Sequence, residues 1–511
     1  MKISLKKKES LIICIIIGLL LMPSGIAKPV TPASDLKSLV LTVDDDGDGD
    51  FIHIQDAIDN ATAGTTIEVY SGEYRENITC NKQLNLQGIP MELGNGSSTG
   101  KPIIVMYDPA CNINLITLYA DDCIITNFHI KGEGSCLGGV EVESCNNNIS
   151  SNDFEHLNFG ICIYLDASNT SVFSNTFTDT GIVMYSDHNK IFENYITNNG
   201  ICIAKPAHHN TLYDNTIVDS YSFGIHLWCT NLNTIYKNTI RRCGIGIEIF
   251  DEGGADDDLV WSNIISNCSK GIETHGKRHI IFQNIIVNCN DGIVCSGKTF
   301  KEYASQVYKN TVDNCENGIV LHSTVNATNN HIHDCTTGLL LDGAFHCFIA
   351  NNTMHKNTDG IILKDSGYSI ICNNTISQNT GTGITFLEGY NNLLYHNVFL
   401  NNHRSAFTDN YLVYPWQDFN HWNLGYTNTG GGNYWSDYRG KDRNHDGIGD
   451  TPYIIPDTFP NPLTNDHDHF PIMDPDTALT CNPTIIKLYT FYDHLIRWLL
   501  QGYPEFYPGF P

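Results

Sequence analysis

The chain has 511 residues and a formal net charge of −27 at pH 7, with 56 acidic side chains against 29 lysines and arginines. This charge repels phosphate backbones and anionic lipid surfaces, so neither nucleic acid nor a membrane surface is an expected partner. The same composition offers many carboxylates to divalent cations such as calcium.

The first 27 residues have the pattern of a secretory signal peptide. Lysines follow Met1, an apolar run spans residues 11–22, and small residues precede a predicted cleavage site after Ala27. The apolar run is short for a membrane-spanning helix. We therefore expect an exported protein, with a linker over residues 28–40.

Residues 41–83 predict an N-terminal cap and the first strands. Ile54, Ala57, Ile58 and Ala61 recur at helical spacing, which gives a short helix one apolar face. A single amphipathic helix ahead of a repeat array can cover the open end of its first coil.

Residues 84–400 contain a repeat of about 22 residues, marked by a recurring asparagine. The asparagines are Asn127, Asn152, Asn175, Asn194, Asn215, Asn238, Asn263, Asn284, Asn310, Asn330, Asn352, Asn374 and Asn397. A glycine before an apolar residue recurs in phase with them, from Gly139 to Gly383. Short alternating apolar runs between Asn, Asp and Gly predict strands and turns.

This period predicts an all-β fold, a right-handed parallel β-helix of about 13 or more coils with three strands each. The hand is expected from the right-handedness of parallel crossovers. Stacking coils about 4.8 Å apart would let each asparagine hydrogen-bond its counterpart in the next coil. Glycine is expected to supply a second tight turn.

Five cysteines follow the same register, each five residues after a repeat asparagine: Cys243, Cys268, Cys289, Cys315 and Cys335. They could form a column of buried thiols, or disulfides between adjacent coils, whose spacing suits such a bond. A metal site is the third alternative, although a linear stack does not give tetrahedral geometry. The chain has 18 cysteines, and removal of Cys14 with the signal peptide leaves an odd number that cannot all pair within one chain.

Two longer inserts interrupt the repeat, at Asp251–Asp258 and Gly297–Ala304. Insertions in solenoids collect on binding faces, so both are candidate ligand loops. The acidic insert could hold a cation or be an ordinary solvated loop. Lys277 and Arg278 lie near it in sequence and form the best candidate for a lyase-like base beside a calcium cluster.

Residues 401–478 predict a C-terminal cap that contains a calcium-like loop. Its expected ligands are Asp442, Asn444, Asp446, the carbonyl group of Ile448, and Asp450. Gly447 allows the sharp turn, but Tyr453 stands where a bidentate glutamate is usual. A further ligand would have to come from Asp466 or Asp468, and a turn stabilised without an ion is the alternative.

A shorter match to the same loop occurs near the N-terminus. Asp44, Asp46, Asp48 and Gly49 fit its first six positions, whereas Gln55 occupies position 12. A calcium site and a simple turn both remain open here.

The last segment, residues 479–511, predicts an amphipathic stretch and a tail. Residues 485–500 are apolar but interrupted by ionisable side chains, which favours packing on the last coil over crossing a membrane. Weak contact with a membrane surface is the alternative interpretation.

The segment Val43–Gly88 resembles the opening of the pectate-lyase-like β-helix superfamily. The run Gly432-Asn433-Tyr434-Trp435-Ser436-Asp437-Tyr438, the loop that follows it and the repeats resemble NosD-like β-helix proteins of archaeal surfaces, over about residues 42–475. The resemblance implies a parallel β-helix that binds carbohydrate, or a periplasmic role in copper insertion. The seven methionines are scattered and His467-x-His469 is isolated, so the residues themselves give copper little support.

The same superfamily includes polysaccharide lyases and hydrolases. Asn357-Thr358-Asp359 matches one hydrolase motif, but the repeat itself generates this pattern, and His275-Gly276 matches another only in part. We therefore expect an exported, non-catalytic cell-surface protein that binds glycans, cell-envelope components or other surface proteins. A polysaccharide lyase or hydrolase, and a NosD-like copper accessory protein, are the alternatives.

Overall fold

The structure, a computed structural model, describes residues 40–105, 114–132, 138–251, 256–297, 304–409, 420–425, 431–457 and 466–478. The predicted signal peptide, the linker up to residue 39 and the segment 479–511 lie outside the described residues. Among the described residues, no helix has the length and apolar character needed to cross a membrane.

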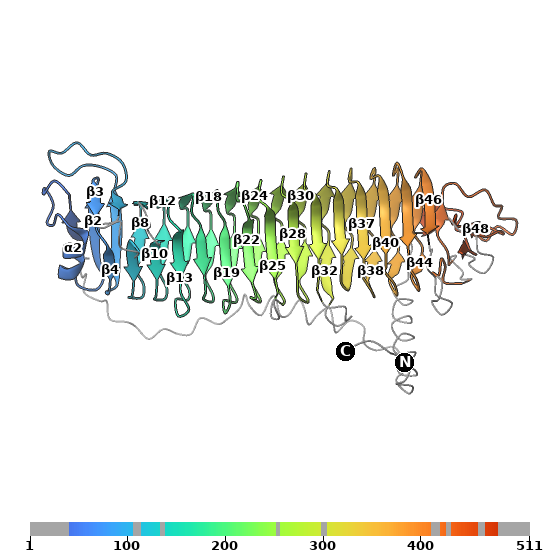
Figure 1. The fold of residues 1–511 in the computed structure, drawn as a ribbon, viewed down its shortest axis with the longest axis horizontal. Coiled ribbons are helices and arrows are strands. Elements are labelled where there is room, and N and C mark those ends of the chain that lie inside the picture. Colours follow the sequence, from blue (N-terminus) through green and yellow to red (C-terminus); the bar gives the residue numbers. More distant parts are fainter. Residues whose placement is uncertain are drawn as a thin grey trace, which may run out of the picture. The chain divides into compact units, whose positions relative to one another are not determined.

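The described chain is a parallel β-helix, as the repeat predicted, and each coil adds one strand to each of three sheets (Figure 1). Two sheets have 16 strands and the third has 15, which corresponds to about 16 coils. We call them sheets A, B and C in the order in which a coil visits them.

Sheet A contains β1 (Val40–Val43), β2 (Thr65–Tyr70), β5 (Leu84–Ile89), β8 (Ile124–Thr126), β11 (Asn148–Ser150), β14 (Ser171–Phe173), β17 (Lys190–Phe192), β20 (Thr211–Tyr213), β23 (Thr234–Tyr236), β26 (Leu259–Trp261), β29 (Ile280–Phe282), β32 (Ser305–Tyr308), β35 (Val325–Thr328), β38 (Phe348–Ala350), β41 (Ile370–Cys372) and β44 (Leu393–Tyr395).

Sheet B contains β3 (Glu73–Arg75), β6 (Ile103–Val105), β9 (His129–Lys131), β12 (Asp153–Glu155), β15 (Thr176–Thr178), β18 (Tyr195–Thr197), β21 (Thr216–Val218), β24 (Thr239–Arg241), β27 (Ile264–Ser266), β30 (Ile285–Val287), β33 (Thr311–Asp313), β36 (His331–His333), β39 (Thr353–His355), β42 (Thr375–Ser377), β45 (Val398–Leu400) and β47 (Tyr434–Trp435).

Sheet C contains β4 (Ile78–Cys80), β7 (Ile116–Leu118), β10 (Gly138–Val142), β13 (Phe159–Ile163), β16 (Ile182–Met184), β19 (Ile201–Ala204), β22 (Phe223–Trp228), β25 (Ile245–Phe250), β28 (Lys270–Thr274), β31 (Asp291–Cys295), β34 (Asn317–Leu321), β37 (Thr337–Asp342), β40 (Asp359–Lys364), β43 (Thr382–Leu387) and β46 (Arg404–Asp409). Outside the three sheets lie α2 (Ile54–Asn60), α3 (Pro475–Ala478) and the antiparallel pair β48 (Tyr453–Ile454) and β49 (His467–Asp468).

The core is built from the central residues of short strands. In β17 and β20 the middle residues Ile191 and Leu212 are fully buried and pair in register, while their neighbours in the strands face outward. This alternation is the period of two expected for a strand with one buried face. Stacking it coil on coil gives one continuous apolar column.

The predicted asparagine ladder is present and buried. Asn284 donates from its backbone N and its Nδ2 to Asn310 Oδ1, both at 3.0 Å, and from Nδ2 to Val260 O at 3.0 Å. Its own Oδ1 accepts the equivalent two hydrogen bonds, each 3.0 Å, from Asn263. The Asn284 side chain thus satisfies backbone groups of the coil before it, and the side chain of Asn310 in the next coil satisfies the backbone N of Asn284.

The two ends of the ladder differ from the prediction. Asn127 is not a member, because it lies one residue early at φ 67° and the backbone N of Phe128 donates to Asn152 Oδ1 at 2.9 Å. At the other end the ladder continues past Phe399. Asn397 donates to Asn433 Oδ1 at 3.0 Å, and Asn433 in turn donates to Asp468 Oδ2 at 2.6 Å.

The glycine ladder has another cause than the one expected. Its glycines do not make the tight turns, which fall instead on residues with positive φ such as Asn288 (59°) and Asp334 (56°). A Cβ atom on Gly271 would lie 2.5 Å from the carbonyl oxygen of Gly292 in the next coil. Glycine is required because the coil backbones approach one another too closely for a side chain.

The predicted helix near the N-terminus is α2, with Ile54, Ala57 and Ile58 buried as the spacing indicated. It packs against β1, β2 and β4. The Glu76 carboxylate accepts hydrogen bonds from the backbone N of Ile54 (2.8 Å) and of Gln55 (2.9 Å), so it caps the first turn. Its role in covering the first coil remains a prediction.

Candidate functional site

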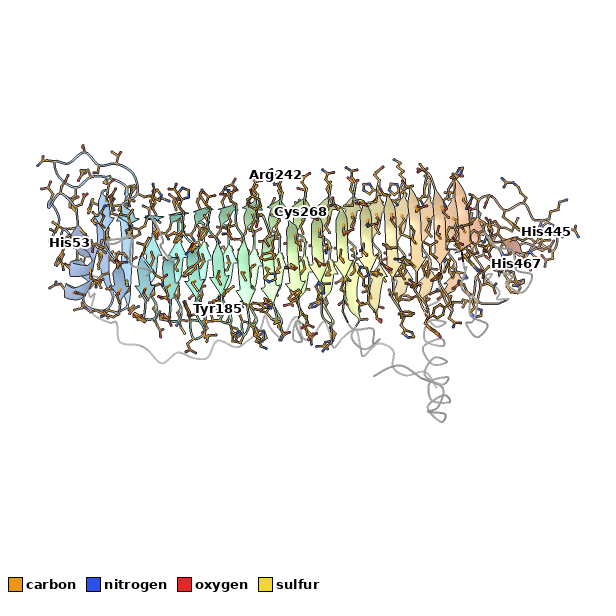
Figure 2. All side chains as sticks on the ribbon, in the orientation of Figure 1. His53, Tyr185, Arg242, Cys268, His445 and His467 are labelled. Carbon is orange, nitrogen blue, oxygen red and sulfur yellow. The ribbon has the colours of Figure 1, made fainter. Side chains whose placement is uncertain are left out.

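One long edge of the β-helix, at the turns between sheets B and C, carries a row of exposed polar side chains, which we call the polar edge. Its members share a positive φ and are Asp179, Asn198, Asp219, Arg242, Asn267, Asn288, Asn314, Asp334, Lys356, Gln378 and Asn401. Several bond along the row, as Asn198 Nδ2 does to Asp179 Oδ1 at 2.7 Å. Figure 2 shows Arg242 on this edge and Cys268 inside the coils.

The polar edge contains an open depression of about 490 Å³. Its lining includes the polar side chains of Asn198, Asp219, Arg242 and Asn267, with Tyr221 beside them. Tyr221 is 98% exposed, the largest exposure among the exposed large apolar and aromatic side chains of the described residues.

Tyr221 lies on a short loop that is fixed to the next coil. Gly244 N donates to Ser220 O at 3.1 Å, and Ile245 N donates to Ser222 O at 2.7 Å. A Cβ atom on Gly244 would lie 2.4 Å from Ser222 O, so glycine makes room for this close contact. The loop therefore presents an exposed aromatic ring on a well-anchored backbone.

Asp219 and Arg242 form an ion pair with two hydrogen bonds in the lining of the depression. Arg242 donates from Nε to Asp219 Oδ1 at 2.6 Å and from Nη2 to Oδ2 at 2.8 Å. The hydrogen bonds from Arg242 lower the pKa of Asp219, so this carboxylate stays ionised and its charge is balanced. The pair offers oriented hydrogen-bonding atoms with little net charge.

A second, outward-facing row consists of aromatic rings on sheet A. The rings are Phe173, Phe192, Tyr213, Tyr236, Trp261, Phe282 and Tyr308, with neighbouring centroids 4.7 to 5.8 Å apart and planes within 9°. Because each ring covers the faces of its neighbours, only ring edges remain accessible along the row. The row therefore stabilises the stack and offers few faces to a ligand.

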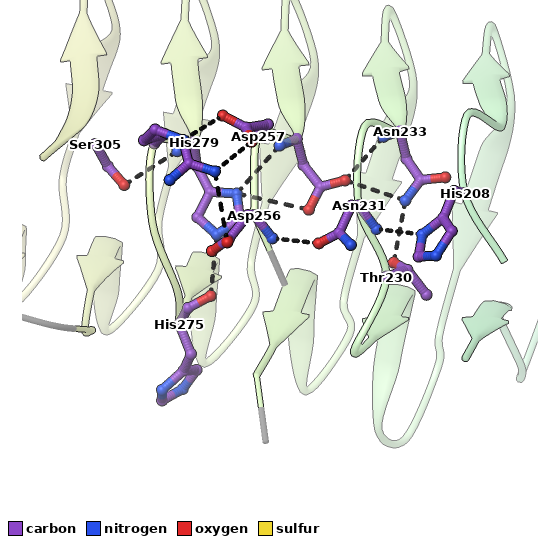
Figure 3. A network of polar contacts seen from close by, with 11 residues as sticks. His208, Thr230, Asn231, Asn233, Asp256, Asp257, His275, His279 and Ser305 are labelled. Atoms are coloured by element: carbon purple, nitrogen blue, oxygen red, sulfur yellow. Dashed lines mark hydrogen bonds and ion pairs between the residues drawn. The ribbon is translucent and has the colours of Figure 1, made fainter. Parts of the chain in front are cut away.

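The turns between sheets C and A contain a buried polar network (Figure 3). Asn233 donates from its backbone N and Nδ2 to Asp258 Oδ1 at 2.9 and 3.0 Å. The Asp258 backbone N donates to His279 Nδ1 at 3.3 Å, and His279 Nε2 lies 3.0 Å from His275 O. Asp258 and His279 thus occupy a ladder position that asparagines fill in earlier coils.

Burial sets the protonation of this network. It raises the pKa of Asp258 to about 8 and lowers the pKa of His279. Their side chains are 0% and 1% exposed. A carboxyl group with a raised pKa would suit acid catalysis, but here no substrate could reach it.

The structure does bring together the acidic insert and the basic residues proposed for a lyase. Lys277 Nζ lies 3.2 Å from Asp256 Oδ2, and Arg278 binds Asp257 through Nε and Nη2 at 2.7 and 2.5 Å. These contacts are ion pairs at the surface. Both carboxylates are balanced by side chains, so the described part of the insert is not a calcium cluster beside a free base.

The hydrolase-like motif is also structural. Asn357 is fully buried and accepts a 2.9 Å hydrogen bond from the backbone N of Cys335, while Asp359 Oδ1 accepts one of 2.7 Å from Thr382 N. Both groups join adjacent coils.

The five cysteines form a buried column of free thiols, the first of the three alternatives. Each thiol donates to the carbonyl oxygen two residues earlier in its own coil, as Cys315 Sγ does to Asp313 O at 3.4 Å. The backbone N of Cys315 donates to Cys335 Sγ at 3.4 Å. Asn357 continues the column in the next coil, so these thiols take the place of a ladder asparagine.

The predicted calcium-like loop folds around its acidic side chains. Asp442 accepts hydrogen bonds from the backbone N of Asp446 (3.2 Å) and Gly447 (2.9 Å), and Asp446 Oδ1 accepts one from Ile448 N (2.9 Å). Asp450 Oδ2 accepts from Arg443 N at 3.0 Å. This arrangement is compatible with an ion and with a turn that binds none.

Neither candidate for the additional ligand faces this loop. Asp468 Oδ2 accepts hydrogen bonds from Asn433 N (2.6 Å) and Trp435 Nε1 (2.9 Å), and Asp466 Oδ1 accepts from Trp422 Nε1 (3.3 Å). Burial raises the pKa of both carboxyl groups to about 6. The two aspartates close the last coil instead.

The N-terminal acidic run contains a more unusual carboxylate. Asp44 is fully buried, and its Oδ1 and the Oε1 of Glu92 are buried without a hydrogen-bond partner. Burial, and then the charge of Glu92, raise the pKa of Asp44. The Asp48 carboxylate accepts a 2.9 Å hydrogen bond from Asn95 N.

Sequence reasoning missed two features of this surface. It did not identify Tyr221, which is exposed because it lies on a short loop, residues 220–222, of a single coil. It also noted His467-x-His469 but overlooked His331-x-His333, a second such pair that lies on one strand, β36. The alternation of side chains along a strand places both of these histidines outside.

Solved structures match this chain at low sequence identity. The mannuronan C-5 epimerase AlgE4 A-module of Azotobacter vinelandii matches with 16% identity and a TM-score of 0.37, over 72% of this chain and 94% of that chain. A tailspike protein mutant of E. coli bacteriophage HK620 matches with 13% identity and a TM-score of 0.42, over 66% and 73%. No curated protein matches this sequence.

The NosD family, described as periplasmic copper-binding protein, matches residues 94–267 and 253–440. These matches cover more than half of the chain. They include the repeat asparagines and the depression, and they end just before the calcium-like loop, which begins at Asp442. The chain belongs to the NosD family.

Proposed function

We propose that this chain is an exported, non-catalytic β-helix protein of the cell surface that binds carbohydrate at the polar edge. The observation that carries this proposal is Tyr221, an almost fully exposed ring on an anchored loop beside the Asp219–Arg242 pair. One exposed ring needs no explanation by itself, but this ring lines a depression together with fixed polar side chains, and that combination supports binding.

The chemistry of the depression suits a sugar. An aromatic face can cover the apolar C–H face of a sugar ring, and fixed polar side chains can bind its hydroxyl groups. Because the loop and the ion pair are already in place, binding would require little ordering of the protein. The polar side chains repeat once per coil, so an extended polymer lying along the edge would meet them successively.

The charge of the chain favours a neutral glycan. With a net charge of −27, the protein repels polyanionic polysaccharides at low salt. Arg242 adds no free positive charge, because Asp219 balances it.

Binding of neutral and acidic polysaccharides to the mature chain tests this proposal by calorimetry. We expect binding of a neutral polymer that Tyr221→Ala weakens about tenfold or more, and that Tyr221→Phe largely keeps. Tyr119→Ala is the matched control, because Tyr119 is also exposed (59%) but lies outside the depression. Equal binding by Tyr221→Ala would contradict the site.

Chemical analysis of the polysaccharides after they are mixed with the protein distinguishes binding from catalysis. New reducing ends or unsaturated products would show a polysaccharide hydrolase or lyase instead of a binding protein. Export itself is tested by N-terminal sequencing of the protein recovered outside the cytoplasm, where the proposal requires a mature end after Ala27.

A copper accessory role is the alternative that the family description suggests. The column thiols do not fit it, because they are buried and bonded within their own coils, and neither do Met184 and Met354, which are fully buried in the core. Imidazole donors do converge at one place on the surface, around His333.

We also propose structural calcium at the two acidic loops. The unpartnered buried oxygen atoms of Asp44 and Glu92 support the N-terminal one, since two adjacent carboxylates need a proton or a cation between them. Calcium should raise Tm relative to chelator, because it binds the native state. Asp446→Ala and Asp44→Asn, measured separately, assign any shift to one loop, and no shift in wild type would exclude both.

A further inference from the structure

Three imidazoles and two carboxylates from consecutive coils meet on the outer face of sheet B. His331 and His333 both project outward from β36, and His355 projects from the next strand, β39. Asp313 of β33 pairs in register with His333, which pairs in turn with His355. Asp334 follows β36 at the polar edge.

The ligand atoms of three of these residues, Asp313, His333 and Asp334, are close enough for a shared ion. His333 Nδ1 lies 3.1 Å from Asp313 Oδ1 and 2.8 Å from Asp334 Oδ2. One ligand atom from each of these three residues lies within 4.8 Å of the other two, and no other such group of three occurs among the described residues. Ligands of a tetrahedral zinc ion with bonds of 2.0–2.1 Å lie about 3.3 Å apart.

Two further nitrogen atoms lie beside this group. His331 Nε2 and His355 Nε2 are 3.2 Å apart, and the three imidazole centroids are separated by 4.9 to 5.2 Å. A protonated His333 between two carboxylates would account for the Asp313 and Asp334 contacts. The two further imidazoles hydrogen-bond each other through their Nε2 atoms, which brings additional nitrogen donors to the same place.

The repeat does not produce this group by itself. Thr311 and Thr353 occupy the positions that pair with His331 on either side, and Ser377 pairs with His355. Histidine therefore stands at these positions although threonine or serine stands beside it in the flanking coils.

We propose that this face binds a divalent transition-metal ion through Asp313, His333 and Asp334, with the imidazoles of His331 and His355 beside it. Imidazole nitrogen and carboxylate oxygen together suit zinc(II) and copper(II), while calcium prefers a shell of oxygen atoms. The site contains no sulfur, so copper(I) is not the expected ion. The ion would tie three coils together at the polar edge.

Calorimetric titration of the metal-free mature chain with ZnCl₂, CuSO₄ and CaCl₂ tests the site. We expect wild type to bind one more equivalent of zinc(II) or copper(II) than His333→Ala does, and the tighter of the two identifies the ion. Asp313→Asn, which keeps the shape of the side chain, should weaken that equivalent about tenfold or more. Circular dichroism checks that each variant folds.

His156→Ala is the matched control. His156 also lies between two carboxylates, but Glu155 is 3.1 Å from Nε2 and Asp179 is 3.1 Å from Nδ1, on opposite sides of the ring. These groups cannot share one ion, so this variant should bind as much metal as wild type. Equal zinc and copper binding by wild type and His333→Ala would overturn the proposal, as would calcium binding that His333→Ala removes to the same extent.

Discussion

Asp258 has an ionisable carboxyl group at a fully buried position. It fills a buried ladder site where Asn189, Asn210 and Asn233 stand in the preceding coils. A neutral side chain suits this site better than a carboxylate, which explains why burial raises its pKa to about 8 from an ordinary 3.8.

We expect Asp258→Asn to stabilise the protein, and more so at higher pH. Between pH 3.8 and 8 the native carboxyl group keeps a proton that the unfolded one has lost, so wild-type stability falls as pH rises through this window. Asparagine removes that loss, which should add about 2–4 kcal/mol to the free energy of unfolding at pH 8 and less than about 1 kcal/mol at pH 4. Urea unfolding at both pH values measures this difference.

The surface variant Asp257→Asn is the control for that experiment, because Asp257 is 38% exposed and paired with Arg278. It should change stability little and without the same pH dependence. A constant effect of Asp258→Asn from pH 4 to pH 8 would show that Asp258 is ionised in the native state.

Asn284 is a typical member of the asparagine ladder, with hydrogen bonds to both neighbouring coils. Asn284→Ala removes the acceptor of two bonds from Asn263 and leaves Val260 O without its donor, all in the interior. We expect a loss of about 2–4 kcal/mol in the free energy of unfolding, because buried polar groups are left unsatisfied. Urea unfolding measures the loss, and Asn290→Ala, at an exposed position whose φ is not positive, should stay within about 0.5 kcal/mol of wild type.

At the scale of structural elements, the thiol column and the asparagine ladders make the same kind of hydrogen bond between coils. A side-chain acceptor at a turn receives the backbone N–H of the preceding coil, and Cys335 and Asn357 perform this role in successive coils. The coils therefore tolerate either residue where the backbone geometry is the same.

The column thiols should be reduced and unreactive in the native protein. A thiol reagent should label Cys145, which is only partly buried, well before Cys243, Cys268, Cys289, Cys315 or Cys335, and label these five only in denaturant. A reductant should leave Tm unchanged. A fall in Tm would instead reveal disulfides, which typically contribute about 2–4 kcal/mol.

At the scale of the whole molecule, the main contribution to stability that opposite charges do not balance is repulsion between acidic side chains. With a net charge of −27, the acidic side chains repel one another in the compact native state. Self-repulsion of this kind is screened by salt, since the Debye length is about 10 Å at 0.1 M.

We therefore expect Tm to rise as sodium chloride is increased from low to moderate concentration. Potassium chloride should act equally, because screening does not depend on which monovalent cation is present. A fall in Tm with salt would mean that surface ion pairs such as Arg242–Asp219 outweigh the general repulsion.

The sequence by itself determined the fold. Short strands repeated with a period near 22 residues bury their apolar faces when three-strand coils stack, and the asparagines and buried cysteines repeat because each coil meets the same neighbour. It also located the short helix α2, the acidic loops and the NosD family. The local sequence pattern was enough to predict a contact wherever that contact repeats from coil to coil.

Only the tertiary structure decided the places where the repeat is broken. It showed that Asn127 is out of register, that the ladder extends to Asp468, and that the glycines permit close backbone approach. Tyr221 and the group around His333 depend on which side chains from different coils become neighbours in space. A repeat period specifies the register of the coils, but the chemistry at a given point depends on individual residues brought together across them.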